Sequence, residues 1–195
     1  MSRTAGLFVQ QFLRSPHTVG ALVPSSVALA RLMLSPIDFA TVRTLVEFGP
    51  GTGAFTREIA ARLPAGCRYL GIELNPRFVH SLSVAFPGLA FVHGSVADLA
   101  HILGTHRVGP VAAIVSGLPW ATLPITLQEQ VFGAMDRALT PGGLFVTFGY
   151  LQSLVLPGAQ ALRRRLHHSF AEVRRSRVVW GNVPPAFAYI CRKGA

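Results

Sequence analysis

The chain reads Val46-Glu47-Phe48-Gly49-Pro50-Gly51-Thr52-Gly53 where a predicted strand, 44–49, gives way to a predicted helix, 52–63. Glycines at such a junction let the backbone turn sharply and approach a ligand closely. The free amides at the start of a helix favour a negatively charged group. The stretch therefore predicts a ligand-binding loop, and the spacing of Gly49, Gly51 and Ala54 also fits a dinucleotide fingerprint.

Strand-like apolar runs alternate with helical patterns from this loop onward. The expected strands are 44–49, 68–74, 89–94, 111–118 and 144–150, and the expected helices are 52–63, 76–86, 96–105 and 126–139. This alternation is typical of right-handed crossovers and a parallel sheet. The nearly continuous apolar character of the strands fits a sheet that is covered on both faces.

The two ends of the chain follow a different pattern. After residue 150 we expect a helix at 158–168 and a hairpin of two strands, 172–180 and 186–192. Before residue 44 we expect a helix at 5–13 and a second one, capped near Ser25 and Ser26, that stops before Pro36. The expected fold is α/β, with seven mostly parallel strands, an antiparallel last strand and N-terminal helices.

Length and composition indicate one folded domain. The chain has 195 residues, half of them hydrophobic, and no apolar run approaches the roughly 18 residues that predict a membrane span. Arg3 and Arg14 interrupt the first apolar stretch, so we expect no signal peptide. The two cysteines and the scattered histidines lack the spacing of metal ligands, and no metal is expected.

The positive charge lies at the two ends of the sequence. Residues 44–150 hold six basic and six acidic residues, whereas 151–195 hold eight basic residues and one acidic residue. Residues 1–43 hold four basic residues and one acidic residue, and the whole chain carries +10. Basic ends attract polyanions, either nucleic acid or an anionic lipid surface, unless they only keep the surface soluble.

Three carboxylates follow or end three successive predicted strands. Glu47 precedes the glycine loop by two residues, and a carboxylate there suits a cationic ligand better than a pyrophosphate. Glu73 ends the next strand, twenty residues beyond Gly53, where it can accept both hydroxyls of a ribose. Asp98 follows the third strand and can accept an adenine amino group.

Glu47-x-Gly49-x-Gly51-x-Gly53, Glu73 and Asp98 resemble the first three motifs of class I S-adenosylmethionine-dependent methyltransferases. The resemblance implies a Rossmann-like fold and S-adenosyl-L-methionine as the cofactor. The cofactor-binding residues that it implies in the central region are Glu47, Gly49, Pro50, Gly51, Thr52, Gly53, Glu73, Leu74, Ser95, Val96, Ala97, Asp98 and Ser116.

Three further stretches resemble bacterial phospholipid N-methyltransferases. They begin at Phe12-Leu13-Arg14-Ser15-Pro16, Ser116-Gly117-Leu118-Pro119-Trp120 and Trp180-Gly181-Asn182-Val183-Pro184. This resemblance implies methylation of phosphatidylethanolamine, up to three times, to phosphatidylcholine. Trp120 and Tyr150 are the candidates for positioning the reacting amine, because aromatic faces hold methylated ammonium groups. The candidate substrate-binding residues are Leu118, Pro119, Trp120, Trp180, Asn182 and Tyr189.

The alternative function is that of the ribosomal RNA adenine N6-dimethyltransferases, whose motifs are similar. That family has Asn-Leu-Pro-Tyr after the fourth strand, where the Asn accepts a hydrogen bond from the flipped adenine and the Tyr stacks on it. This chain has Gly117 in place of the Asn and lacks that family's C-terminal helical domain. We therefore expect no nucleic-acid partner. A non-catalytic binding protein would not need the three carboxylates.

The N-terminal segment, 1–43, is expected to contact both cofactor and membrane, beside a cofactor-binding core, 44–150, and a basic helix and hairpin, 151–195. Gly20, Ser25 and Ser26 belong to a stretch predicted to fold over the cofactor. Phe8 and Phe12 share one helical stripe, and with Arg3 and Arg14 they predict binding to an anionic membrane. These patterns predict a cytoplasmic protein, peripheral on the inner face of the cell membrane, without an obligate protein partner.

Overall fold

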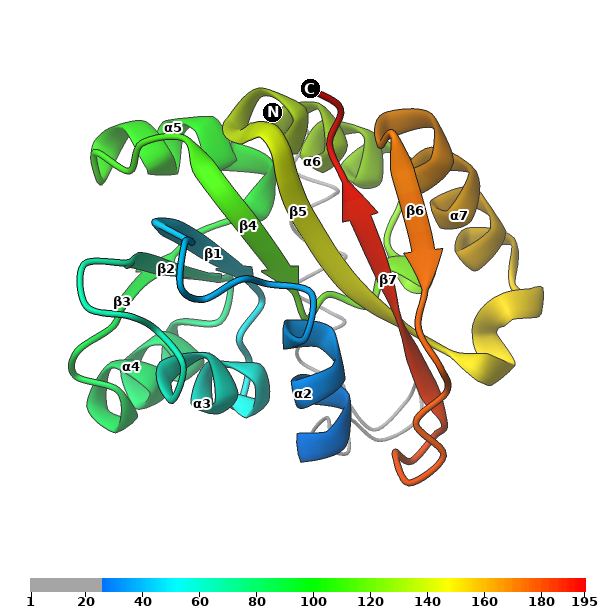
Figure 1. Cartoon of the computed structure of the whole chain (residues 1–195), viewed down its shortest axis with the longest axis horizontal. Helices are drawn as coiled ribbons and strands as arrows, with labels where there is room; N and C mark the ends of the chain where they lie inside the picture. The colour runs from blue at the N-terminus through cyan, green and yellow to red at the C-terminus, as the bar shows by residue number, and fades with distance from the viewer. Residues whose placement is uncertain (1–25) are drawn as a thin grey trace.

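The computed structural model describes residues 26–195, which form a seven-stranded sheet in the order β3-β2-β1-β4-β5-β7-β6 (Figure 1). The strands are β1 (Thr44–Phe48), β2 (Arg68–Glu73), β3 (Ala90–His93), β4 (Val111–Ser116), β5 (Leu139–Tyr150), β6 (Glu172–Arg175) and β7 (Ala186–Arg192). β3, β2, β1, β4 and β5 pair in parallel, whereas β7 is antiparallel to both β5 and β6. The expected sheet, with its antiparallel last strand, is confirmed.

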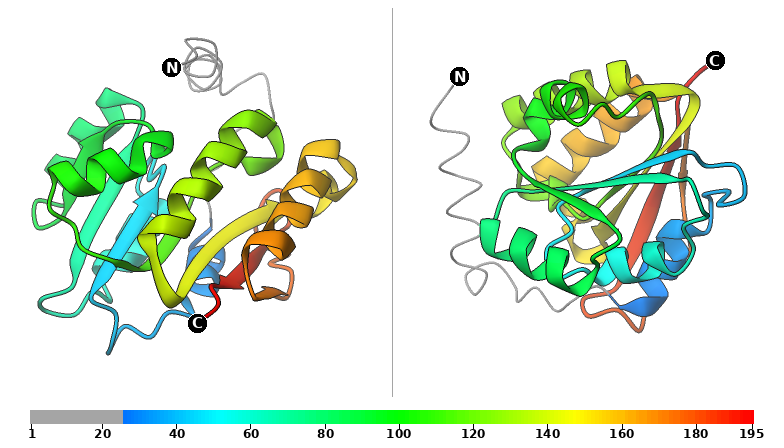
Figure 2. Two further views of the ribbon diagram at one scale, coloured as in Figure 1. Left: turned by 90° about the horizontal axis from the view of Figure 1, so that it is seen from above. Right: turned by 90° about the vertical axis from the view of Figure 1, so that its left-hand side faces the viewer.

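Helices cover both faces of the sheet. They are α2 (Val27–Leu34), α3 (Ala54–Ala60), α4 (Pro76–Ala85), α5 (Leu99–Thr105), α6 (Ile125–Ala138) and α7 (Pro157–Ser169), with short 3-10 turns η1 (Val96–Asp98), η2 (Trp120–Thr122) and η3 (Leu151–Val155). One apolar core lies between the sheet and α5, α6 and α7, and a second lies beneath α2 and α3. Figure 2 shows these two layers of helices.

Three of the expected boundaries that were wrong have a local reason. The predicted strand 172–180 ends at Arg175, because the Ser176 hydroxyl replaces a backbone acceptor for the Ala188 N–H. β5 begins at Leu139 rather than 144, because Leu139 pairs with Val111 and the register then shifts at the glycines. α3 begins only at Ala54, since Gly53 has a φ of 84°, outside the helical region.

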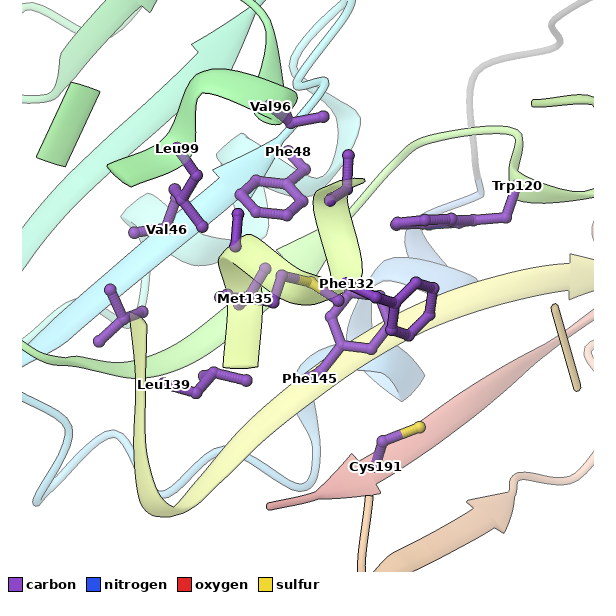
Figure 3. Packing of buried hydrophobic residues seen from close by; sticks show 14 of the residues in the cluster. Val46, Phe48, Val96, Leu99, Trp120, Phe132, Met135, Leu139, Phe145 and Cys191 are labelled. Atoms are coloured by element: carbon purple, nitrogen blue, oxygen red, sulfur yellow. The ribbon is translucent and has the colours of Figure 1, made fainter. Parts of the chain in front are cut away.

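The loop after β4 is fixed by buried polar bonds. Trp120 packs among aromatic rings of the larger core (Figure 3), 5.2 Å from Phe132 and 5.8 Å from Phe145 between centroids. Its indole N–H donates to the Ser116 hydroxyl at 2.9 Å. Gln128, on α6, donates from Nε2 to the carbonyls of Trp120 and Leu123, both at 3.0 Å. The start of α6 therefore holds the loop against the sheet.

A second polar contact joins the two ends of the described chain. Ser26 caps α2 as expected, because its hydroxyl accepts the Leu29 N–H. The Ser26 N–H donates to Oδ1 of Asn182 at 2.9 Å, and Nδ2 of Asn182 donates to the Pro184 carbonyl at 2.7 Å. This buried amide ties α2 to the segment between β6 and β7. Among residues 26–195, no helix has both the length and the apolar character of a membrane span.

Gln128→Ala is expected to lower the free energy of unfolding by about 2 kcal/mol. The change removes two buried hydrogen bonds from the side chain to backbone carbonyls, and of these carbonyls that of Trp120 still accepts the Leu123 N–H. Urea unfolding should be compared with that of Gln130→Ala, which alters the same amino acid on an exposed face of the same helix and should change stability by less than about 0.5 kcal/mol. Equal losses in the two variants would contradict the anchoring role of Gln128.

Candidate active site

The candidate site lies where the sheet changes its winding direction. From β1 the chain moves outward to β2 and β3, then returns to add β4 and β5 on the other side of β1. Ligands of doubly wound sheets bind at the carboxyl ends of the strands beside such a switch point. The glycine loop after β1 and the Gly117 loop after β4 meet there, on the lower side of Figure 1.

The glycine loop has a backbone that other residues rarely adopt. Gly49, Gly51 and Gly53 have φ values of 64°, 58° and 84°. A β-carbon at Gly49 would also lie 2.7 Å from Cδ2 of Leu118, in the loop after β4. The loop therefore requires glycine for its conformation and for its close packing. Pro50 is buried beneath it, and Thr52 is exposed at its surface.

Glu73 connects the glycine loop to the end of β2. Its carboxylate is buried, with Oε2 accepting the Gly51 N–H at 3.0 Å and Oε1 accepting the Asn75 N–H at 2.8 Å. Each carboxylate oxygen can accept a second hydrogen bond. The position suits the acceptor of two ligand hydroxyls, and binding of the cofactor ribose here stays a prediction.

Glu47 lies fully buried beneath α3. Its Oε2 accepts hydrogen bonds from the Thr56 hydroxyl at 2.9 Å and the Tyr69 hydroxyl at 2.6 Å. Within residues 26–195, its Oε1 is buried and has no hydrogen-bond partner. Burial raises the pKa of this carboxyl from its ordinary value of 4.5 to about 7, although the two hydroxyls act in the opposite direction. A cationic group of a ligand would satisfy Oε1.

The third strand brings a polar turn to the same edge. The Ser95 hydroxyl accepts the Ala97 N–H at 3.2 Å and thereby starts η1, in which Val96 is buried and Asp98 is exposed. Leu74 is half-buried after β2, and its carbonyl binds His93 at 3.0 Å. The exposed Asp98 carboxylate is free to meet a ligand amino group, as the sequence predicts.

Trp120 cannot hold the substrate amine in this arrangement. Only 1% of the residue is exposed, and its ring contributes to the core rather than to the site. Ser116, which was expected to bind the cofactor, is also fully buried, and its hydroxyl accepts the indole N–H of Trp120. The expectation for Trp120 is corrected, and cofactor binding by Ser116 stays a prediction. The hydroxyl partner allows the large indole to be buried without losing a hydrogen bond.

Tyr189 and Asn182, two further residues expected to bind substrate, instead support the fold. Tyr189 is buried on β7 against Phe187, with ring centroids 5.0 Å apart, so its ring face is closed to a substrate. Both ends of the Asn182 amide are used in joining Ser26 to Pro184. Trp180 lies in the exposed turn beside Asn182 and not in the loops around Gly49. The substrate roles of Tyr189 and Asn182 are therefore withdrawn.

Three expected substrate residues keep suitable positions. Leu118 and Pro119 are half-buried in the loop that follows β4. Tyr150 is half-buried at the carboxyl end of β5, with its ring edge-on to Phe148 at 5.4 Å. Burial raises the pKa of the Tyr150 hydroxyl, so this group stays protonated near neutral pH and does not act as a base. Its aromatic ring remains the candidate surface for the amine.

Several expected residues lie outside the part of the chain that the structure describes. They are Gly20 and Ser25 of the predicted cofactor cover, and Arg3, Phe8, Phe12 and Arg14 of the predicted membrane helix. Ser26, the last residue of that cover, uses its hydroxyl and its N–H in the contacts that fix α2. Its contact with the cofactor stays a prediction.

The sequence reasoning missed the residues that support Glu47. Thr56 and Tyr69 provide its two hydrogen bonds, and Gly71 makes room for them, because a β-carbon there would lie 2.9 Å from the Tyr69 hydroxyl. The sequence provides only a weak indication of this arrangement, namely a polar residue, Thr56, on the core side of α3 and a glycine, Gly71, inside strand β2.

Comparison with known proteins identifies the family. Residues 45–143 match the family described as "Methyltransferase domain". Ornithine lipid N-methyltransferase of Singulisphaera acidiphila is 34% identical over 190 residues, which span 95% of this chain and 94% of that protein. The chain belongs to the methyltransferase domain family. Its cofactor is S-adenosyl-L-methionine, which supplies an electrophilic methyl group on sulfur.

Solved structures share the fold of this methyltransferase. N-methyltransferase NodS of Bradyrhizobium japonicum aligns with a TM-score of 0.67 at 19% identity, over 95% of this chain and 98% of its own. NodS has also been solved with S-adenosylhomocysteine bound. The O-methyltransferase TomG of Streptomyces achromogenes, solved with the cofactor, aligns at 0.70 and 16% identity, over 100% of this chain and 91% of its own. At these identities the likeness shows the fold alone.

The described residues fit the cofactor. A glycine-lined loop, a buried carboxylate with spare acceptor positions at Glu73 and an unsatisfied carboxylate oxygen at Glu47 provide acceptors for hydroxyl and ammonium groups. The exposed Asp98 provides a further acceptor at the edge. These residues would bind and orient the cofactor.

Glu73→Ala is expected to weaken binding of S-adenosylhomocysteine by roughly 10- to 150-fold. The reason is the loss of hydrogen bonds to a charged carboxylate, each worth about 1.5–3 kcal/mol. Calorimetry should compare it with Glu129→Ala, which removes an exposed carboxylate on α6 and should bind like the wild type. Wild-type affinity in Glu73→Ala would refute this assignment.

Glu47 is expected to make stability fall as pH rises. The folded chain keeps the carboxyl proton up to a pKa of about 7, whereas the unfolded chain loses it near 4.5. Between these pH values the unfolded chain binds fewer protons, so the free energy of unfolding decreases by about 3 kcal/mol and then levels off. Urea unfolding of the cofactor-free chain from pH 5 to 8 should show this slope, and Glu47→Gln should remove it. If the free energy of unfolding depended on pH in the same way in the wild type and in Glu47→Gln, Glu47 would not be the source of the slope.

Proposed function

We propose that this chain transfers methyl groups from S-adenosyl-L-methionine to the primary amine of a membrane lipid. The observation that carries the proposal is the 34% identity to ornithine lipid N-methyltransferase over 95% of the chain. This similarity extends beyond residues 45–143, the part that the general methyltransferase family matches. Segments outside the cofactor-binding core are those that distinguish one substrate class from another on a shared fold.

Ornithine lipid and phosphatidylethanolamine are the two substrates to consider. Both headgroups end in a primary amine, so the same chemistry applies to each. The curated relative acts by name on ornithine lipid, whereas the resemblance of the sequence motifs favours phosphatidylethanolamine, methylated towards phosphatidylcholine. We propose ornithine lipid as the first substrate to test, with phosphatidylethanolamine as the second.

The loop after β4 disfavours the RNA alternative. A β-carbon at Gly117 would lie 2.7 Å from the carbonyl oxygen of Gly49. The Asn that the RNA adenine enzymes use in this sequence position therefore does not fit without moving the glycine loop. The Trp120 ring is closed in the core and cannot stack on a flipped base. Both features support a small primary amine rather than a nucleobase.

The reaction needs little from the protein beyond placement and removal of water. The neutral amine must approach the methyl carbon in line with its bond to sulfur, and fixed geometry can lower such a barrier substantially. Leu118, Pro119 and Tyr150 form the half-buried surroundings of the proposed amine site. The amine loses its proton to water before transfer. The basic region 151–195 supports an anionic membrane surface as the partner.

Labelled cofactor and mixed vesicles test this function. With vesicles of ornithine lipid or phosphatidylethanolamine in a phosphatidylglycerol background, we expect mono- and multiply methylated lipid, resolved by chromatography. Glu73→Ala should lose most of this activity at low cofactor concentration, and Glu129→Ala should retain it. Ribosomal RNA should remain unmethylated. Robust adenine methylation without any lipid product would reverse the assignment.

A further inference from the structure

Large apolar side chains are exposed at one edge of the molecule. Among residues 26–195, those with more than 40% exposure are Val27, Val84, Ile125, Val155, Leu156, Trp180 and Val183. All except Val84 belong to segments at the carboxyl end of the parallel strands, the edge that carries the candidate site. We call these six residues the apolar rim: Val27, Ile125, Val155, Leu156, Trp180 and Val183.

Specific contacts join the segments of the apolar rim. The start of α2 is bound to Asn182 in the turn between β6 and β7, which carries Trp180 and Val183. The start of η3 is bound to the end of the same turn, because the Leu151 N–H donates to the Pro185 carbonyl at 2.9 Å. In Figure 1, α2 lies at the lower centre, the turn between β6 and β7 lies to its right, and η3 lies at the right edge.

Ile125, at the start of α6, is connected to the other segments of the apolar rim through α7. Gly158, in the first turn of α7, lies so close to Ala121 that a β-carbon would be 2.0 Å from its carbonyl oxygen. This contact places Val155 and Leu156, which precede α7, beside the η2 turn that leads to Ile125. The segments that carry the apolar rim are therefore connected one to the next along this edge, which also carries the loop of Leu118 and Pro119, the proposed amine site.

The turn that carries Trp180 is held in place. Asn182 is buried and uses both ends of its amide, and Val179 pairs with Ala186 across the turn. Trp180 is nevertheless 70% exposed and Val183 67% exposed. A supported turn that displays a tryptophan to solvent is not accounted for by packing within the described residues. Tryptophan favours the boundary between lipid and water, where one side of the ring is apolar and the other is wet.

The charge beside the rim has the sign that an anionic bilayer attracts. Two basic residues lie beside the turn of Trp180: Arg175 ends β6, and Arg177 precedes Trp180 by three residues. Among residues 26–195, neither has a carboxylate within ion-pair distance. Arg192 and Lys193 lie at the opposite edge, beside the start of β5. Basic side chains near an anionic leaflet strengthen binding that exposed apolar side chains alone would leave weak.

We propose that the apolar rim docks onto an anionic lipid bilayer and inserts Trp180 and Val183 among the headgroups. The proposal rests on the lipid substrate put forward above. Docking through this edge turns the carboxyl ends of the strands, and with them the glycine loop, towards the membrane. A headgroup amine then reaches the site from the bilayer surface without complete extraction of the lipid.

Tryptophan fluorescence of the full chain tests the contact directly. The chain has two tryptophans, and Trp120 is buried in the core while Trp180 is exposed. Phosphatidylglycerol vesicles should shift the wild-type emission to shorter wavelength, and bromine-labelled lipid should quench it. Trp180→Phe should bind the vesicles but lose both signals, because Trp120 lies too deep to respond. Quenching that persists in Trp180→Phe, or shielding of Trp180 from acrylamide before vesicles are added, would overturn the proposal.

Vesicle sedimentation provides the second test, with a matched control. Val155→Asp combined with Val183→Asp should weaken binding roughly tenfold, because partial burial of two valines is lost and two negative charges face an anionic surface. Val84→Asp changes an equally exposed valine near the end of α4, at the opposite edge of the sheet, and should bind like the wild type. Added salt should weaken wild-type binding. Equal binding by all three proteins would overturn the proposal.

Activity measurements separate this proposal from the proposed function. The Val155/Val183 double variant should methylate a short-chain, monomeric lipid substrate at the wild-type rate while losing activity on vesicles. If the wild type methylates no lipid in either form, the proposed function fails, and binding by the rim is judged from fluorescence alone. If the wild type methylates lipid and the double variant matches it on vesicles, the rim is not the docking surface.

Discussion

The close approach of two backbone segments is the constraint on which this site depends. The Gly49 N–H donates to the Ile72 carbonyl on one side, and the Gly117 N–H donates to the Phe48 carbonyl on the other. A side chain at Gly117 would strike the Gly49 carbonyl, and one at Gly49 would strike Leu118. The loops after β1 and β4 are thereby held together, so the glycine loop and the proposed amine site are fixed relative to each other. Such fixed placement is what a transfer between two small reacting atoms requires.

Two carboxylates complete this wall in different ways. Glu73 satisfies its oxygens with backbone N–H groups of the glycine loop and of the turn after β2, so it shapes the loop before any ligand binds. Glu47 is buried more deeply, and one of its oxygens has no partner among residues 26–195. An unsatisfied buried carboxyl costs stability in the free chain. Contact between this oxygen and a cationic group of the cofactor would recover that cost, and this contact stays a prediction.

The order of strands and helices could be predicted from the sequence because buried parallel strands leave uninterrupted apolar runs. The glycine loop and Glu73 were predictable from this strand order, because the carboxyl ends of neighbouring parallel strands lie at the same edge of the sheet. Orientation was not predictable. Trp120 and Tyr189 were expected to offer aromatic faces to the amine, and Asn182 was expected to contact the substrate. Ser116 and Ser26 instead provide partners that let Trp120 and Asn182 be buried. A residue type does not reveal on which side of the backbone its partner lies.

Trp180 shows how the substrate can be distinguished on a fold that many methyltransferases share. NodS and TomG have the same sheet at low sequence identity, so the sheet by itself does not select a substrate. The transfer step needs only an in-line amine, and a soluble amine and a lipid amine would present the same atoms to the proposed site beside Leu118 and Tyr150. Selection must therefore act on delivery, through surfaces outside the glycine loop. The turn of Trp180 and Val183, held by Asn182 at the edge where the strands end, is the surface that we propose for this role, because it would favour amines that are anchored in a bilayer.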